Sequence, residues 1–457
     1  MLLLFALLLT APPHAARGQD GGGPIPMPTD ALSDEERAAI QAQLAGVVAA
    51  LGLPAAQSGV LGPRQVSFRF PLEVDPAYSD FGFHFTSNFV DQQLGAGVQD
   101  YACGARTYDG HTGIDFTLFP FRVLMMEAGA VRAVAAADGV IIGKNDGLPD
   151  HNCGPSPGGI GNVVYLKHAD GSTTWYGHLR KGSLTSKPVG ASVSAGEVLG
   201  IVGSSGNSGG PHLHFQVHDA EGALIDPFAG ACNQRNTASW WQQQPAYRES
   251  AIAALRTGSS PSVVNTCPNP EITNERQTFA PGEKGVFTAY FRDQQSGQSV
   301  QYRLLRPDGT VFQAWSQTMT STLSASHWYW EWVLPSGPTG LWTFEAVYEG
   351  RTYARTFTVG TGTGMETPVR GFRIGVPYPN PMGASATLSL ELPLPGPVRV
   401  EAFDMLGRRI TRLYEGVLEA GPAQIVLGTA ALSPGLYRLR VTTPAGVAHL
   451  NSVRAQH

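Results

Sequence analysis

Short alternating runs of apolar and polar residues, split by Gly, Asp and Pro, extend from Val66 to about Pro227. Examples are VSFRF, AVRAVAA, GVIIG, NVVYLKH and HLHFQV. Successive side chains of a strand point to opposite faces, so this pattern is typical of β-strands joined by turns. The chain has 55 Gly and 34 Pro but only 15% charged residues, which favours short strands over long helices. We therefore predict a mainly β protein.

The length of 457 residues is too great for one hydrophobic core, so we predict several domains. The first covers 66–230 and holds the runs above. Similar runs over 267–360, with an Asp-Gly hairpin signal between two of them, predict an Ig-like β-sandwich. A linker over 361–371 leads to 372–457, where the same pattern predicts a small β-sandwich.

Two segments break the β pattern and are expected to be helical. The first, TDALSDEERAAIQAQLAGVVAALG, follows a Gly/Pro-rich spacer, and together they form a predicted N-terminal segment over 19–65. Ser33 is a suitable N-cap, and Glu36 lies three residues further on, which is the spacing of a capping box. The second, SWWQQQPAYRESAIAALRT, is expected to be a helix within a connecting segment over 231–266.

The N-terminus predicts export. MLLLFALLLTAPPHAARG has an apolar stretch from Leu2 to Leu9, followed by small residues and proline. This predicts a signal peptide over 1–18, cleaved near Ala15–Gly18. The stretch is far shorter than the ~20 residues that span a bilayer, so we expect no transmembrane helix in the mature chain. A net charge of −5 and a pI near 6.2 give no reason to expect nucleic-acid binding.

Four cysteines, none of them in a C-x-x-C pair, suggest two disulfides in an exported chain rather than a cysteine-based zinc site. Four cysteines allow three pairings. We favour Cys103–Cys153 and Cys232–Cys267 because each closes a shorter loop.

The segment SSGNSGGPHLHFQV places two histidines one residue apart in an apolar run. In a strand, His212 and His214 lie on one face, whereas Leu213 and Phe215 lie on the other. The apolar side chains then anchor the strand in a core, and the histidines are presented together. The Gly-rich sequence before them allows a ligand to approach the backbone closely.

Further polar residues upstream suit a metal site. In YDGHTGIDF, His111 and Asp115 are four residues apart, a spacing that allows a common face on an extended segment. Catalytic zinc takes three protein ligands and a water. His111, Asp115 and one of the two histidines of HLH supply three. The other histidine and His178 of WYGHL then remain for acid–base work, which predicts metal-assisted hydrolysis.

Three motifs together resemble the lysostaphin/LytM-type zinc metallopeptidases, which are peptidoglycan endopeptidases built on a twisted antiparallel sheet. They are H-x3-D from His111, Y-x-H-L around His178, and G-x-S-x-G-P-H-L-H-F ending at Phe215. The resemblance covers about a third of the chain. It implies His111, Asp115 and His214 as zinc ligands, with His178 and His212 as the catalytic imidazoles. One departure is Gln216, where the family often has Glu.

The C-terminal region resembles the sorting domain of type IX secretion cargo. Three pieces carry the resemblance: YPNP from Tyr378, D-x-L-G-R from Asp404, and L-x-P-G-L-Y from Leu432. It implies a bacterium with an outer membrane, in which the type IX machinery delivers the chain to the cell surface or releases it.

The expected function is therefore that of a secreted zinc metalloendopeptidase acting on peptide cross-links of peptidoglycan, as a monomer. Three alternatives stay open. The chain is a non-catalytic wall-binding or regulatory module, an extracellular protease acting on Gly-rich proteins, or an adhesin whose Ig-like and C-terminal domains carry the function.

Overall fold

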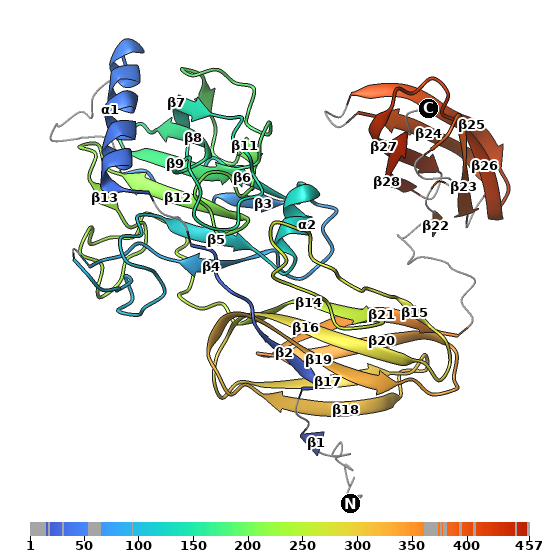
Figure 1. Cartoon of the computed structure of the whole chain (residues 1–457). Coiled ribbons are helices and arrows are strands. Elements are labelled where there is room, and N and C mark those ends of the chain that lie inside the picture. The colour runs from blue at the N-terminus through green and yellow to red at the C-terminus, as the bar shows by residue number, and fades with distance from the viewer. Residues whose placement is uncertain are drawn as a thin grey trace, which may run out of the picture. The chain divides into compact units, whose positions relative to one another are not determined.

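The computed structural model describes residues 15–16, 19–29, 32–53, 65–93, 95–360, 373–374, 377, 382–392, 395–404, 408–443 and 446–454. The chain forms two compact units, Met1–Val359 and Gly360–His457. Strands, most of them in antiparallel pairs, make up nearly all of the regular structure (Figure 1). The prediction of a mainly β fold is confirmed.

A central antiparallel sheet of the first unit carries the HLH motif (Figure 1). Its strands in spatial order are β10 (Ser192–Val193), β7 (Gly139–Asn145), β8 (Asn162–Lys167), β9 (Thr173–Leu179), β12 (His212–His218), β5 (Ile114–Leu118) and β4 (His84–Asn88), with β13 (Leu224–Ile225) also paired to β12. One face of β12 contributes Leu213, Phe215 and Val217 to the hydrophobic core. The opposite face is left for its polar side chains, as the alternation predicts.

A smaller sheet packs into the same core. It is formed by β11 (Val198–Ile201), β6 (Val131–Val134) and β3 (Leu72–Val74). The short helix α2 (Arg122–Glu127) follows β5 and buries Val123 and Met126 in that core. These elements share one apolar core with β12 and β5.

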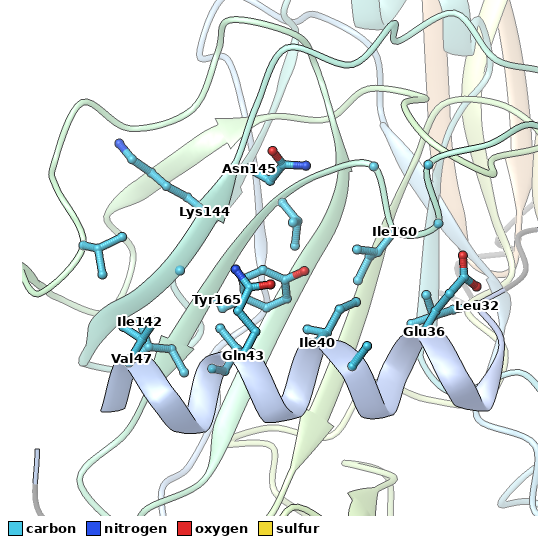
Figure 2. Close-up of a pocket in the computed structure, with 18 residues that line it drawn as sticks. Leu32, Glu36, Ile40, Gln43, Val47, Ile142, Lys144, Asn145, Ile160 and Tyr165 are labelled. Atoms are coloured by element: carbon cyan, nitrogen blue, oxygen red, sulfur yellow. The ribbon is translucent and has the colours of Figure 1, made fainter. Parts of the chain in front are cut away.

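The predicted N-terminal helix is confirmed as α1 (Asp34–Ala50). Its capping box forms as expected: Ser33 Oγ accepts a hydrogen bond from Glu36 N at 3.2 Å, and Glu36 Oε2 accepts one from Ser33 N at 2.9 Å. The helix packs its apolar face, with Leu44, against Ile142 and other side chains of the sheet. A cavity of about 580 Å³ remains between them, and Figure 2 shows helix side chains directed towards β7 and β8.

Two further sheets of the first unit form the predicted Ig-like β-sandwich. One contains β1 (Ala15–Ala16), β18 (Val311–Thr318), β17 (Ser299–Leu305), β20 (Gly340–Tyr348), β21 (Arg351–Val359) and β15 (Thr278–Phe279). The other contains β14 (Ala251–Gly258), β16 (Lys284–Gln294), β19 (Leu323–Val333) and β2 (Gly21–Pro24). Trp315, Trp330 and Trp342 are buried between the sheets.

The expected connecting helix over SWWQQQPAYRESAIAALRT is wrong. Ala251–Gly258 is β14, a strand paired to β16, and no helix lies between Ser239 and Ser250. Both faces of β14 are buried: Ile252 joins the sandwich core, while Ala253 packs in a neighbouring apolar cluster. A strand buried on both sides loses its alternation, so its apolar run cannot be told from a buried helix by periodicity.

The favoured disulfide pairing is also wrong. The bonds are Cys103–Cys232 and Cys153–Cys267, with Cα–Cα distances of 5.1 and 5.8 Å. The entropic cost of closing a loop grows slowly, by only ~0.6 kcal/mol per doubling of its length. The pairing therefore depends on which cysteines the fold brings together. Cys232 and Cys267 follow the strands of the central sheet, and the chain returns there to the loops that contain Cys103 and Cys153.

The second unit consists of two small sheets around one core. The strands are β22 (Arg373–Ile374), β23 (Ser385–Leu392) and β26 (Gly421–Gly428) in one sheet, and β25 (Arg409–Leu418), β24 (Gly396–Phe403), β27 (Gly435–Thr443) and β28 (Gly446–Arg454) in the other. This agrees with the predicted small β-sandwich. YPNP, the Leu and Gly of D-x-L-G-R, and the predicted linker lie outside the described residues.

The predicted signal peptide also lies outside the described residues, except for Ala15–Ala16, which pair with β18. Within the described part of the chain, neither helix combines the length and apolar character needed to cross a membrane.

Candidate metal centre

Neighbouring strands bring the five predicted side chains together at the centre of the large sheet. His214 on β12 lies directly opposite Asp115 on β5 and opposite Gly177 on β9. His178 follows that glycine, and His111 lies three residues before β5. All five side chains are buried, with at most 2% of each residue exposed.

The carboxylate of Asp115 is the hub of this cluster. Its Oδ1 lies 3.2 Å from His111 Nε2, 3.1 Å from His214 Nδ1 and 3.6 Å from His212 Nε2. One ligand atom each from His111, Asp115 and His214 lies within 4.8 Å of the others. Asn88 donates a hydrogen bond of 2.9 Å to Oδ2, which fixes the orientation of the carboxylate.

The outer nitrogen of each of two imidazoles is held by a carbonyl oxygen. His111 Nδ1 lies 2.7 Å from Phe89 O, and His214 Nε2 lies 3.0 Å from Gln216 Oε1. A carbonyl oxygen only accepts, so these outer nitrogens carry protons, and in a neutral imidazole the inner nitrogens then present lone pairs to Asp115. Lone pairs that face a carboxylate repel it, whereas a cation among them turns the repulsion into attraction.

The donor set therefore fits a divalent metal ion. Two imidazole nitrogens and one carboxylate oxygen are ligands that suit zinc. Gly113 allows the close approach of His214, because a Cβ there would lie 2.5 Å from the imidazole ring. Carbonyl groups that hold the outer nitrogens of metal-binding histidines are typical of such sites.

His178 and His212 form a pair beside this set. Their ring centroids are 4.7 Å apart. Nδ1 of His178 lies 2.7 Å from Ser205 O, and Nδ1 of His212 lies 2.7 Å from Gly210 O. Because a carbonyl oxygen only accepts, each Nδ1 carries a proton. His178 has a φ of 60°, an unfavourable backbone conformation for a residue with a Cβ.

A hydrogen-bonded row behind His214 is the part of the site that the sequence did not predict. Gln216 Oε1 also accepts from Thr112 Oγ1 at 2.9 Å, and Gln216 Nε2 donates to His218 Nε2 at 3.1 Å. Burial, with smaller contributions from Arg37 and His214, lowers the pKa of His218 to about 3, so its imidazole is neutral and accepts. Alternation on β12 does predict that Gln216 and His218 share the face of His214, but it does not predict the hydrogen bonds that join them.

A cavity of about 520 Å³ opens beside the candidate metal ligands. Its lining includes His111, His214 and Tyr108, whose ring lies 4.5 Å from that of His111. Asp109 and Asn207 also line it. The site is thus a buried cluster of bases at the wall of an open cavity, which is suited to binding a polar substrate.

Comparison with known proteins agrees with this arrangement. Residues 110–227 match the model of peptidase family M23, and this region contains all five predicted side chains. The DD-carboxypeptidase/endopeptidase Mpg of Neisseria meningitidis serogroup B is 38% identical over 125 residues, which are 27% of this chain and 24% of that protein. The glycyl-glycine endopeptidase ALE-1 of Staphylococcus capitis is 34% identical over 208 residues, 45% of this chain and 46% of that protein.

Among solved structures, the catalytic domain of the prophage-encoded M23 protein EnpA from Enterococcus faecalis is similar. It is 26% identical with a TM-score of 0.22, and the similarity covers 34% of this chain and 95% of that one. The chain spans about a quarter of the length of Mpg and less than half of that of ALE-1. The chain thus carries a region similar to M23 peptidases, joined to further β domains.

Proposed function

We propose that the chain is a zinc metalloendopeptidase that hydrolyses peptide cross-links of bacterial peptidoglycan. The observation that carries the proposal is the convergence of two imidazole nitrogens on the Asp115 carboxylate. In this proposal, His111, Asp115 and His214 hold the metal. The match to family M23 and the names of the relatives, both of them endopeptidases, support a peptide substrate.

The side chains divide the chemistry between them. Zinc held by the three ligands would supply a hydroxide nucleophile near neutral pH and polarise the scissile carbonyl. The imidazole of His178 or His212 whose Nε2 is unprotonated takes the proton of the attacking water and delivers it to the leaving amine. The other imidazole, protonated at Nε2 from solvent before the step, donates a hydrogen bond to the developing oxyanion. Ser205 O and Gly210 O hold both rings in the required orientation.

We also propose that the protein is secreted and reaches the outer surface through the type IX machinery. The apolar N-terminus and the sequence resemblance of the C-terminal region support this proposal. Substrates would then be foreign cell walls or extracellular peptides, because the cell's own wall lies inside the outer membrane. We further propose that the enzyme acts as a monomer.

Mass analysis of muropeptides tests the proposed activity. Purified protein with Zn²⁺ is incubated with intact sacculi and with a glycine-bridged wall, since the two relatives are named for different peptide bonds. We expect cleaved cross-links from at least one wall, and none from His214→Ala. If wild-type protein with bound zinc releases no fragments, the enzymatic proposal fails and a wall-binding module becomes the better explanation.

A further inference from the structure

One short segment of the chain, residues 204–210, holds both predicted catalytic histidines. It lies between β11 and β12 and belongs to neither strand. Ser205 O lies 2.7 Å from His178 Nδ1, and Gly210 O lies 2.7 Å from His212 Nδ1. The orientation of both imidazole rings therefore depends on the position of this segment.

The first half of the 204–210 segment is held by the loop that contains Cys153. Asn152 N donates a hydrogen bond of 3.0 Å to Ser204 O, and Ser204 Oγ donates one of 2.6 Å to Asn152 O. The side chain of Asn152 adds a third bond, in which Nδ2 donates to Gly206 O at 2.7 Å. A movement of this loop would therefore move the segment with it.

The Cys153 loop is tied covalently to a hairpin that leaves the Ig-like sandwich. The disulfide partner of Cys153 is Cys267, which lies in the hairpin 259–276. Val263 and Ile272 pair across this hairpin through hydrogen bonds of 2.8 and 3.0 Å. The hairpin follows β14, which pairs with β16 of the sandwich, so the sandwich anchors it.

The same hairpin also reaches helix α2 through Glu271. This residue is 5% exposed, and its carboxylate accepts hydrogen bonds from Val123 N at 3.2 Å and from Leu124 N at 3.1 Å. The N-cap of α2, Phe121, has no side-chain hydrogen bond of its own. Glu271 thus takes the place of a local cap and fixes the start of the helix.

Arg122, the first residue of α2, links this contact to the other end of the 204–210 segment. A Cβ on Gly210 would lie 3.1 Å from Arg122 Nη1 and 3.2 Å from its Cζ, so the guanidinium packs directly on the glycine. Burial lowers the pKa of Arg122, and the negative charge of Glu271 opposes that shift. The hairpin therefore supports the segment at both ends, through the disulfide and through α2.

We propose that the hairpin 259–276 positions both predicted catalytic histidines, with Cys267 supporting one end of the 204–210 segment and Glu271 the other. This inference rests on the proposed peptidase function. Cys267 and Glu271 are positioning residues, because they act on the imidazoles through other groups. A displacement of ~1 Å in a reacting group can lower a rate by ~10²-fold. The Ig-like sandwich is then a part of the catalytic apparatus.

The test removes one disulfide at a time from the full chain. Cys153→Ala/Cys267→Ala releases the hairpin, and Cys103→Ala/Cys232→Ala is the matched control. The two bonds have sequence separations of 114 and 129, so their loss should lower stability by similar amounts. With a soluble quenched peptide, we expect kcat of the first variant to fall by about 10–100-fold, while KM and Zn²⁺ affinity stay within a few fold of wild type. The control should keep the kcat of wild type.

Glu271 provides an independent variant, which decides the matter if the first disulfide variant no longer binds Zn²⁺. Glu271→Ala should lower kcat in the same way. Glu271→Gln should restore much of it, because the amide oxygen still accepts a hydrogen bond. The matched control is Glu275→Ala, since Glu275 lies in the same hairpin but faces Arg256 at 3.2 Å.

A spectroscopic measurement separates this proposal from the proposed function. In ¹H–¹⁵N spectra of the histidine rings, the Nδ1–H signals of His178 and His212 should shift in Cys153→Ala/Cys267→Ala and not in the control. Any one of three results would overturn the positioning role: wild-type kcat in that variant, an equal loss in both disulfide variants, or unshifted ring signals. If zinc-loaded wild type cleaves no peptide, the proposed function fails, and the ring signals still decide whether the hairpin positions the histidines.

Discussion

Two parts of the central sheet hold buried histidines in opposite ways. In the turn between β8 and β9, His168 lies 2.8 Å from Asp138 O through Nδ1 and 2.8 Å from Thr174 Oγ1 through Nε2. At the centre of the sheet, His111 and His214 each have one nitrogen held by a carbonyl, and the other directed at Asp115. Burial is nearly equal in the two regions. What distinguishes the candidate metal centre is the group that faces the second nitrogen.

The largest effect should come from replacing a ligand. His214→Ala removes one of three donors and leaves Asp115 facing a single inner imidazole lone pair of the proposed set. We expect both Zn²⁺ binding, measured by competition with a chromophoric chelator, and hydrolysis to fall below detection. If the variant binds Zn²⁺ with the affinity of wild type, His214 is not a metal ligand and has only a structural role, like that of His168.

His178→Ala should separate chemistry from metal binding. The imidazole is in the site but outside the proposed ligand set, so we expect hydrolysis to fall by about 10²–10⁴-fold while Zn²⁺ affinity stays within a few fold of wild type. Steady-state kinetics beside the same chelator competition checks this. A parallel loss of zinc would place His178 among the ligands.

Gln216→Leu should weaken the metal site from behind. It removes the acceptor that fixes the proton of His214 on Nε2. We expect Zn²⁺ affinity to fall by about 10–100-fold, and Gln216→Glu to restore it because a carboxylate also accepts from that nitrogen. Gln92→Leu is a matched control, since Gln92 is equally buried but bonds to Asp226. Equal affinities of Gln216→Leu and wild type would contradict this positioning role.

The smallest effect should come from His168→Phe, which changes stability and not hydrolysis per folded molecule. Two buried hydrogen bonds are lost, so the free energy of unfolding of the metal-free chain at pH 7 should fall by ~1–3 kcal/mol. Burial lowers the pKa of His168, so below its unfolded pKa near 6.5 the unfolded state takes up more protons and wild-type stability falls. The variant lacks this loss. Guanidinium unfolding should therefore show a smaller difference between the two proteins at pH 5 than at pH 7, and a constant difference would contradict this account.

Much of the fold was predictable because alternation is a local signal. The strands of the central sheet and the capped helix α1 each follow from a pattern within one segment. The same holds for the five predicted side chains, which three short motifs place on β5, β9 and β12 or just before them.

What the sequence did not predict depends on contacts between distant segments. Asn88 reaches the site because β4 pairs with β5, and Thr112 reaches it through its hydrogen bond to Gln216 across the sheet. The disulfides and the hydrogen bond from Asn88 to Pro28 O likewise join residues that are more than fifty positions apart. β14 was mistaken for a helix because it is buried on both faces, which removes the local signal altogether.

The most direct test of the zinc peptidase is cleavage of one defined cross-linked peptide by chelator-treated protein, followed by mass spectrometry as Zn²⁺ is added back. We expect no cleavage without metal and a rise that saturates at about one equivalent of Zn²⁺ per chain. Cleavage that is equally fast in the metal-free protein would contradict a zinc peptidase.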